Sequence, residues 1–361
     1  MQTTVLHLIP SLSGGGAERQ LALLARALAQ AGLRVHLGYL YDGPNSQAAH
    51  ADGVVLHRLP AFGNHDPLLL RRVLRLIRTT RADLVQTWLP QMDVIGGLAA
   101  RWTAVPVILT ERSSAGAYAG SLKDALRLRI GRRSAAVVAN SQSGLEYWRA
   151  QGYAGRGVVI RNGVVAAAAV DDSSIGTPRE RIILFVGRLS PEKNLPRLIA
   201  ALDQVLRGRQ EYVAILCGEG PQRAELERQI TTLPTRDRIR LAGFRTDLED
   251  WMRRAAVFVS ASAFEGHPNA VLEAMMLGCP LVVSDIPQHR EILDERSAVF
   301  CSPDSSADIA AGIERALDDA AASRARVAAA RLRAAGCSVD AASAAYVELY
   351  TAILCEQQRN P

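Results

Sequence analysis

Cysteine is scarce and irregularly spaced in this sequence, which excludes two kinds of cross-linked fold. The chain has five cysteines, an odd number, and no two of them form a C-x-x-C pair. Disulfide frameworks and zinc ribbons both need closely spaced, paired cysteines. We therefore expect a reducing compartment and a small, buried, hydrophobic role for each cysteine. The five are Cys217, Cys279, Cys301, Cys337 and Cys355.

Membrane-spanning and metal-binding patterns are missing as well. No stretch of about 18 uncharged apolar residues occurs, so the sequence predicts no transmembrane helix. The first four residues carry no basic side chain, and the apolar run Val5–Ile9 is only strand-sized, unlike a signal peptide. There is no D-x-D pair and no two histidines at metal-binding spacing. We expect a cytoplasmic protein.

What the sequence does contain is enough apolar residues for two domains. Its 361 residues are 48% hydrophobic and 22% charged, and this length exceeds one ordinary core. The net charge of +6 is uneven, because residues 1–175 carry 19 Lys and Arg against 11 Asp and Glu, whereas the remainder carries 23 against 25. The positive charge therefore lies in the first half of the chain.

Strand-like and helix-like segments alternate along both halves. Thr4–Ile9 predicts a buried strand before a helix over Ala17–Ala31, and Arg181–Gly187 predicts a strand before a helix over Asn194–Arg207. Such alternation is typical of a doubly wound parallel sheet. We thus predict an α/β fold with two facing Rossmann-like domains, whose ligands bind at the carboxyl ends of the strands in a cleft between them.

The domain boundaries follow from a break in this regularity. Alanines, an Asp-Asp-Ser-Ser run and Gly-Thr-Pro between positions 164 and 179 are typical of a linker. We assign residues 1–170 to the N-terminal domain, 171–180 to the linker and 181–340 to the C-terminal domain. Residues 341–361 are predicted to form a C-terminal helix, and whether it packs back on the N-terminal domain stays open.

A glycine-rich turn follows the first strand, over residues 11–19. Gly15 and Gly16 would let backbone N–H groups approach a phosphate at the start of a helix. The dinucleotide pattern G-x-G-x-x-G fails, because Arg19 stands where its last glycine belongs. An NAD enzyme is therefore disfavoured, and an ordinary strand–helix turn is the alternative.

Two cations flank the turn after the first strand of the second half. Arg188 follows the strand end at Gly187, and Lys193 comes directly before the predicted helix. Cations at these two places can clamp a diphosphate and the charge of a departing group. The alternative is two solvated surface side chains.

Two glutamates separated by seven residues flank a Gly-His-Pro-Asn segment. Asn269 predicts a helix N-cap, with Glu273 in the first turn, where its carboxylate can accept hydrogen bonds from ribose hydroxyls. Glu265 lies in the preceding loop, within reach of a sugar or phosphate. Acidic residues also favour the start of a helix for electrostatic reasons alone, but the spacing around Gly-x-Pro-Asn favours a binding site.

Three motifs together resemble glycosyltransferase family 4. They are E-G-x-P-N-x-x-x-E from Glu265, G-R-L-x-x-E-K-N from Gly187 and G-G-A-E-R from Gly15. The resemblance covers essentially the whole chain, with the motifs in the family's order. It implies the GT-B fold, with an N-terminal acceptor domain and a C-terminal nucleotide-sugar donor domain. It also implies a retaining transferase that needs no metal, because Arg, Lys and a helix end replace it.

The resemblance also implies roles for individual residues. Arg188 and Lys193 would neutralise the diphosphate, Glu273 would bind the ribose, and Glu265 would lie at the donor sugar; the catalytic candidates are Glu265, Arg188 and Lys193. The donor-binding residues that it implies are Gly15, Gly16, Arg188, Lys193, Glu219, Phe244, Arg245, Glu265, Gly266, His267, Asn269, Ala270, Val271 and Glu273.

The first half departs from the family's pattern in two places. Many members have a donor-contacting histidine after the strand that matches Val105–Thr110, and here Glu111 and Arg112 follow it. Either residue is our candidate for the acceptor or sugar side. The family's Asn-Gly turn is usually followed by an apolar residue and an acid, whereas Asn162-Gly163 is followed by two valines.

Two basic segments, Pro67–Arg81 and Lys123–Arg133, carry much of the positive charge. Both fit docking on an anionic lipid surface, where a lipid-linked acceptor would wait, and both also fit surface helices with solvated arginines. Nucleic acid is disfavoured, because no aromatic residues interleave with the arginines. The candidates for membrane contact are Arg71, Arg72, Arg75, Arg78, Lys123, Arg127, Arg132 and Arg133.

The leading hypothesis is a retaining hexosyl- or N-acetylhexosaminyltransferase. The resemblance suggests a UDP-sugar donor, because UDP donors are common in the family, and a glycan or lipid-linked glycan acceptor in bacterial polysaccharide synthesis. No cofactor is expected, since the nucleotide sugar is a substrate. The alternatives are a GT-B-fold nucleotide-sugar epimerase and a relative that only binds. Intact Arg188, Lys193, Glu265 and Glu273 disfavour the second alternative.

Overall fold

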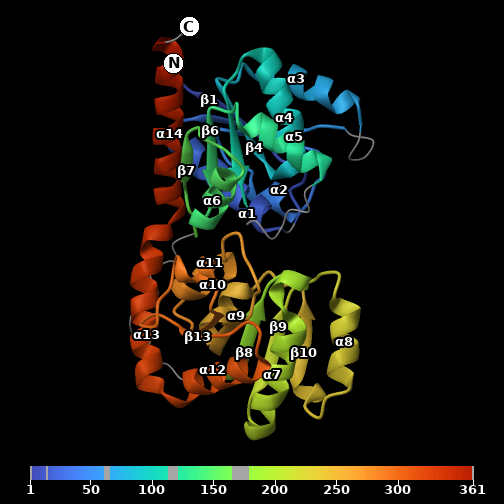
Figure 1. Cartoon of the computed structure of the whole chain (residues 1–361), viewed down its shortest axis with the longest axis vertical. Helices are drawn as coiled ribbons and strands as arrows, with labels where there is room; N and C mark the ends of the chain where they lie inside the picture. The colour runs from blue at the N-terminus through green and yellow to red at the C-terminus, as the bar shows by residue number, and fades with distance from the viewer. Residues whose placement is uncertain (1, 14, 61–65, 113–120, 165–178, 360–361) are drawn as a thin grey trace. The chain divides into compact units, whose positions relative to one another are not determined.

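The chain forms two compact units in the computed structural model, which describes residues 2–13, 15–60, 66–112, 121–164 and 179–359 (Figure 1). Unit 1 consists of Met1–Val165 and Ser338–Pro361, and unit 2 of Ala166–Cys337. Most of the predicted linker, residues 171–178, lies outside the described ranges, and Glu180 already belongs to a strand.

Unit 1 is built on a seven-stranded sheet with the strand order β3-β2-β1-β4-β5-β6-β7. Every neighbouring pair is parallel. Strands β1, β4 and β5 are buried along their whole length, as expected when helices cover both faces of a parallel sheet. The strands are β1 (Thr4–Leu8), β2 (Arg34–Tyr39), β3 (Val54–Arg58), β4 (Leu84–Trp88), β5 (Val107–Glu111), β6 (Ala136–Ala139) and β7 (Gly157–Val159).

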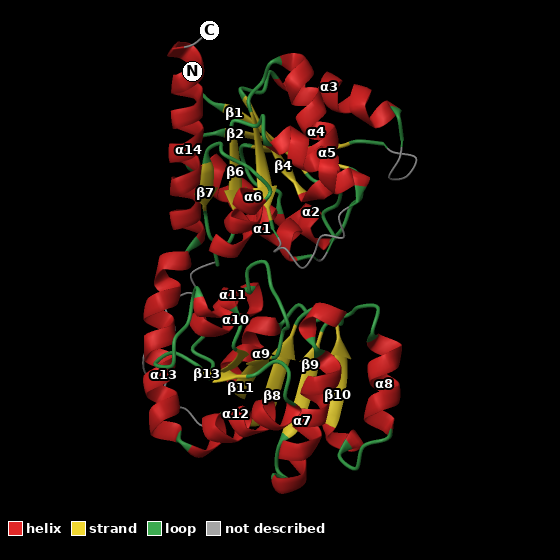
Figure 2. Cartoon of the chain, in the orientation of Figure 1, coloured by secondary structure: helices red, strands yellow, loops and turns green. Residues whose placement is uncertain are grey.

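Helices cover this sheet on two faces, each with its own hydrophobic core (Figure 2). On one face Tyr350 and Ile353 of the C-terminal helix pack in the same cluster as Leu21 and Leu28 of the first helix. No described helix, the C-terminal one included, is long and apolar enough to cross a membrane. The helices are α1 (Gly16–Gln30), α2 (Pro44–Ala48), α3 (Leu68–Thr80), α4 (Leu89–Thr103), α5 (Leu122–Gly131), α6 (Gln142–Ala150) and α14 (Val339–Arg359).

Unit 2 repeats the same plan with six parallel strands in the order β10-β9-β8-β11-β12-β13. Counted within each unit, the first six strands of both sheets follow the order 3-2-1-4-5-6 of doubly wound nucleotide-binding folds. The expectation of two α/β domains with parallel sheets is therefore confirmed. The strands are β8 (Glu180–Val186), β9 (Val213–Cys217), β10 (Ile239–Gly243), β11 (Ala255–Ser260), β12 (Leu281–Ser284) and β13 (Val299–Cys301).

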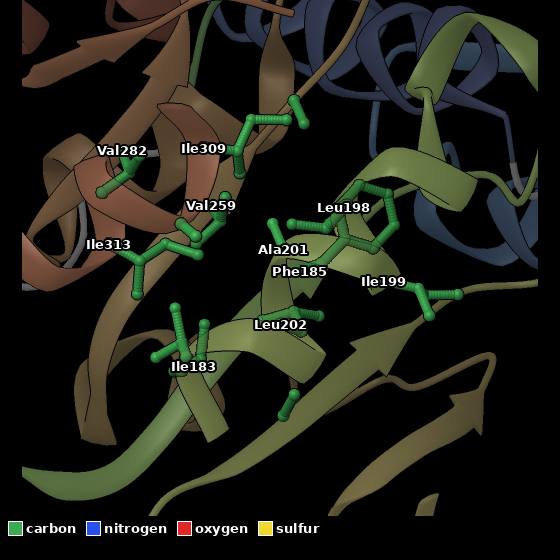
Figure 3. Packing of buried hydrophobic residues seen from close by; sticks show 14 of the residues in the cluster. Ile183, Phe185, Leu198, Ile199, Ala201, Leu202, Val259, Val282, Ile309 and Ile313 are labelled. Carbon is green, nitrogen blue, oxygen red and sulfur yellow. The ribbon is translucent and has the colours of Figure 1, made fainter. Parts of the chain in front are cut away.

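The core of unit 2 lies between this sheet and helices α7 and α12. Leu198 and Leu202 of α7 and Ile309 and Ile313 of α12 belong to one buried cluster with Phe185 of β8 (Figure 3). The helices are α7 (Leu195–Gly208), α8 (Arg223–Thr231), α9 (Leu248–Arg254), α10 (Asn269–Met276), α11 (Pro287–Arg290), α12 (Ser306–Asp318) and α13 (Ala320–Ala334).

The five cysteines form no disulfide with one another, and four of them are buried. Burial raises the pKa of Cys279 and Cys301 to about 12 and that of Cys217 to about 11, so these thiols are unreactive. Cys355 is exposed on α14, and the expectation that every cysteine is buried is wrong there. It lies in the last turns of the helix, beyond the buried Ile353.

A buried ion cluster ties α5 to the sheet of unit 1. Arg127 Nε donates to Asp93 Oδ2 at 2.6 Å, and its Nη1 lies 2.9 Å from Glu111 Oε2, with all three side chains at most 2% exposed. Thr87 Oγ1 and Trp148 Nε1 donate to the two carboxylates at 2.6 and 2.9 Å. Burial raises the pKa of Asp93, and the Arg127 cation opposes that effect. Each charge in the cluster therefore depends on the others to remain buried.

The prediction that Arg127 faces a membrane is wrong, because this side chain points into unit 1. The neighbouring cations Lys123, Arg132 and Arg133 are exposed. The sequence of an arginine-rich helix does not by itself show which arginine is buried. Arg127 is buried because the carboxylates of Asp93 on α4 and Glu111 on β5 need a cation.

Replacing Arg127 by methionine should leave two buried carboxylates without their cation. We expect the free energy of unfolding, measured by urea denaturation, to fall by about 3–5 kcal/mol. The control is Arg129→Met on the same helix, where the side chain is exposed and the change should stay within about 0.5 kcal/mol. Equal losses in the two variants would contradict the assignment.

Candidate functional site

The turn after β8 carries the two predicted diphosphate cations. Arg188 is exposed two residues beyond the end of the strand, and Lys193 closes a short 3₁₀ helix, η3 (Pro191–Lys193). Asn194 then adopts a left-handed conformation with φ of 55°, a region that asparagine tolerates better than most residues. Its side-chain amide donates to the backbone oxygens of Ala261 and Pro303 at 3.1 and 2.7 Å. The turn is thus anchored to the loops that follow β11 and β13.

Glycines let the loop after β9 lie directly against this turn. Gly218 has φ of 145°, and a side chain there would overlap the carbonyl oxygen of Gly187. At Gly220 a side chain would meet the backbone of Leu189 in the same way. Glu219, between the two glycines, is held at the carboxyl edge of the sheet by the Leu189 N–H, which donates to its carbonyl at 3.0 Å.

Lys193 and Glu265 meet at this edge in a partly buried ion pair. Lys193 Nζ donates to Glu265 Oε1 at 2.6 Å, and the two side chains are 20% and 9% exposed. Ser262 Oγ donates to the same carboxylate oxygen at 2.7 Å. The Ala263 N–H donates to the carbonyl of Glu192 at 2.9 Å, so the backbones of the two loops are also joined. The structure therefore brings together two predicted residues that lie 72 positions apart.

Helix α10 begins one residue earlier than an N-cap at Asn269 would place it. Pro268 is its N-cap and Asn269 its first residue, because the carbonyl of Pro268 accepts from the Leu272 N–H at 3.0 Å. The prediction of Asn269 as N-cap is wrong, and Glu273 lies one turn inside the helix rather than in its first turn. Ala270 and Val271 belong to the first turn, whose N–H groups have no acceptor within an α-helix. Of the first-turn groups, the Asn269 N–H donates to the carbonyl of His267 at 2.9 Å.

The other predicted donor-side residues of unit 2 lie on exposed loops. Glu219 pairs with Arg223 at 2.9 Å, and Phe244 is 56% exposed. Arg245 forms two hydrogen bonds with Asp247, at 2.9 and 2.6 Å, and lowers the pKa of that carboxyl to about 2. The Gly218 N–H donates to the Gly243 carbonyl at 2.8 Å, so the loops after β9 and β10 lie side by side.

The glycine turn of unit 1 holds a carboxylate where a phosphate was expected. Glu18 accepts from Ser11 Oγ and Ser13 Oγ, both at 3.1 Å, and a side chain at Gly15 would overlap this carboxylate. Glu18 is in the first turn of α1, where the helix dipole favours negative charge. A diphosphate beside Gly15 and Gly16 would be repelled by it, so the turn is a weaker phosphate site than its glycines suggest. Gly14 lies outside the described residues.

Glu111 and Arg112, the two candidates for the acceptor or sugar side, lie in different environments. Glu111 is fully buried, and its carboxylate is bound by Arg127 and Trp148, so it is not available to an acceptor. Arg112 stacks on Trp88 with 4.1 Å between the guanidinium carbon and the ring centroid, and donates to Asn162 Oδ1 at 2.8 Å. It lines a pocket in unit 1 formed by Gln20, Leu23, Leu24, Trp88, Arg112, Arg161, Asn162, Gly163, Val339, Ala342 and Tyr346.

Sequence reasoning missed Ser262 and Asn194, which hold Glu265 and the turn after β8. The only local signal is the left-handed preference of asparagine before Leu195. Ser262 resembles any serine near a strand end, because its bond to Glu265 depends on how the loop after β11 folds back over three residues, which the sequence does not reveal.

Gly218→Ala should distort the contact between the loops after β8 and β9. The left-handed strain alone costs about 1–3 kcal/mol, and the overlap with Gly187 adds to it, so we expect a clear loss in urea denaturation. Gly208→Ala is the matched control, because nothing lies within 4 Å of a side chain at the end of α7. That variant should be neutral or more stable by up to about 1 kcal/mol. A tolerated Gly218→Ala would contradict the close approach.

Two family models divide the chain between them. The model described as "Glycosyltransferase Family 4" matches residues 14–167, and the one described as "Glycosyl transferases group 1" matches residues 171–333. The boundary between the matches falls within residues 168–170.

Curated relatives and a solved structure agree with these matches. The GDP-mannose-dependent alpha-mannosyltransferase of Mycolicibacterium smegmatis is 30% identical over 268 residues, 67% of this chain and 68% of that protein. Glycogen synthase of Mycobacterium tuberculosis is 34% identical over 178 residues, 48% of this chain, and the chain spans only 43% of its length. The crystal structure of Anabaena HepE in complex with UDP-glucose has a TM-score of 0.84 at 23% identity and covers 97% of this chain and 100% of that one. The chain therefore has the GT-B fold and belongs to glycosyltransferase family 4.

Proposed function

We propose that this protein transfers a sugar from a nucleotide-sugar donor to a glycan or lipid-linked glycan acceptor, with retention of configuration and without a metal. The observation that carries the proposal is the meeting of Lys193 and Glu265 at the carboxyl edge of the unit 2 sheet, beside the exposed Arg188. Doubly wound folds bind nucleotides at this edge.

The cations of this edge suit the charge that develops when a sugar leaves a diphosphate. An ammonium group has three donors, so Lys193 can hold Glu265 and a phosphate oxygen at the same time. Arg188 makes no ion pair with any described residue, and its guanidinium can face a second phosphate oxygen. The first turn of α10 adds backbone N–H groups, whose partial positive charge also attracts a phosphate. Positive charge from the chain itself thus takes the place of a metal ion.

In the proposed reaction the bond between the anomeric carbon and the diphosphate oxygen breaks while the acceptor oxygen bonds to the same face of that carbon. The departing phosphate takes the acceptor's proton, and Arg188 and Lys193 stabilise its charge. Glu273 binds the ribose hydroxyls, and Glu265 lies beside the donor sugar. The protein's contribution is to position the groups and stabilise the leaving group.

The donor is proposed to be a UDP-hexose or UDP-N-acetylhexosamine. The support is the UDP-glucose in the complex of the structurally similar HepE, whereas the mannosyltransferase relative is named for GDP-mannose. The relatives described above are named as a transferase and a synthase, and nothing in the site favours the epimerase. The acceptor is proposed to be a bacterial polysaccharide intermediate.

The exposed cations of unit 1 are proposed to hold the protein at the anionic inner face of the cytoplasmic membrane. Helix α3 buries Leu69, Val73 and Ile77 and exposes Arg71, Arg75 and Arg78. Arg72 is less available, because it pairs with Asp66 at 2.6 Å. Lys123, Arg132 and Arg133 near α5 add exposed positive charge.

Nucleotide binding tests the donor site. In EDTA, UDP at about 100 times its dissociation constant should raise the unfolding midpoint by about 5–10 °C. Arg188→Ala and Glu273→Ala should each lose most of this shift. Arg181→Ala is the control, because Arg181 lies at the amino end of β8 and is exposed. A shift that survives both site variants, or that appears only with NAD, would overturn the proposal.

Vesicle binding tests the membrane surface. The triple variant Arg71, Arg75 and Arg78→Gln should bind vesicles rich in phosphatidylglycerol about 100-fold more weakly than the wild type, since each cation contributes about 1 kcal/mol. A second triple variant, Arg228, Arg236 and Arg240→Gln, removes the same charge from exposed positions of unit 2 and should bind like the wild type. Equal weakening in the two variants would point to net charge rather than to α3.

A further inference from the structure

A chain of buried polar side chains lies behind Glu265. Ser260, Ser262 and Ser284 are at most 5% exposed, and His289 is fully buried. They come from the ends of β11 and β12 and from α11. Buried hydroxyl and imidazole groups are costly unless each is hydrogen-bonded, so the partner of each proton can be traced.

The backbone of β12 determines which nitrogen of His289 carries its proton. His289 Nδ1 lies 2.8 Å from the carbonyl oxygen of Ser284, which can only accept, so Nδ1 must be the donor. Burial lowers the pKa of His289, with opposing effects from Glu265 and Asp285 and a reinforcing one from Lys193. The ring is therefore neutral near pH 7, and Nε2 presents a lone pair. Ser260 Oγ, 3.4 Å from Nε2, is the donor to it.

Each serine proton then has one destination. Ser284 Oγ donates to the carbonyl of Ser262 at 2.6 Å, and Ser262 Oγ donates to Glu265 Oε1 at 2.7 Å. Ser260 Oγ lies 3.4 Å from Ser262 Oγ and directs its own proton to His289. The imidazole thus links the end of β12, through Ser284, to the end of β11, through Ser260. The loop that carries Ser262 and Glu265 starts at the end of β11, and Ser284 also donates to it at the Ser262 carbonyl.

From this geometry we infer that His289 is a positioning residue for Glu265, acting through Ser284, Ser260 and Ser262. It does not reach the surface, so it makes no contact with a substrate. It fixes the loop from which Ser262 donates to the Glu265 carboxylate, and so fixes the oxygen that Lys193 shares. The expected effect on catalysis rests on the proposed function. The coupling between His289 and Glu265 does not.

Three substitutions separate the two contacts of the ring. His289→Asn keeps a donor near the position of Nδ1 and loses the contact with Ser260. His289→Gln places its amide near the position of Nε2 and loses the donor to Ser284. His289→Leu removes both. Because the bond to Ser284 is the shorter, we expect turnover to fall in the order wild type, Asn, Gln, Leu.

The first readout is release of UDP from UDP-glucose, compared with the midpoint shift that UDP causes. His289→Leu should lower kcat about 10-fold or more while keeping the UDP-induced shift, and His289→Asn should recover part of the loss. Ile313→Val, which removes a buried methyl group from the unit 2 core, controls for a general loss of stability. Turnover of His289→Leu equal to that of this control would overturn the inference.

The second readout does not need activity. Ser262→Ala removes the donor to Glu265, and the midpoint loss of the double variant with His289→Leu should be no larger than the greater of the two single losses. Losses that add fully would overturn the inference. If the wild type released no nucleotide from any nucleotide sugar, the proposed function would be overturned instead. The additivity of the midpoint losses would then be the only test of the coupling between His289 and Ser262.

Discussion

The ion pair between Lys193 and Glu265 is the interaction on which the candidate site depends. A carboxylate that is 9% exposed is stable at the end of a strand only if a cation and a hydrogen-bond donor reach it. Lys193 and Ser262 meet both needs, and the pair of Lys193 with Glu265 joins the loops after β8 and β11, which are neighbours in the sheet. The positions of Arg188 and of the start of α10 follow from the same two loops.

The architecture could be predicted from the sequence because a parallel sheet covered on both faces has strongly apolar strands. Two strands, β7 (Gly157–Val159) and β13 (Val299–Cys301), were not predicted, because three residues are too few to show a repeating pattern. The candidate site was predictable where a motif is contiguous, as at residues 187–194 and 265–273. It was not predictable where an orientation is chosen by distant partners, as with the inward turn of Arg127 and the burial of Glu111.

The two units use charge in opposite ways. In unit 1 Glu18 occupies the glycine turn, and Glu111 and Asp93 are buried around Arg127, so these three carboxylates stabilise the fold. In unit 2 Arg188 is exposed and Lys193 keeps donors in excess of its one carboxylate partner. We therefore propose that unit 2 provides most of the binding of the diphosphate, and that the glycine turn of unit 1 contributes less than its sequence suggests.

The central claim is that cations of unit 2 recognise a diphosphate, and calorimetric titration with UDP and UMP tests it most directly. The wild type should bind UDP about 10-fold or more tightly than UMP, because the second phosphate gains charge-assisted hydrogen bonds. In the double variant Arg188→Ala and Lys193→Ala the two nucleotides should bind alike. An undiminished preference for UDP in that variant would contradict the account.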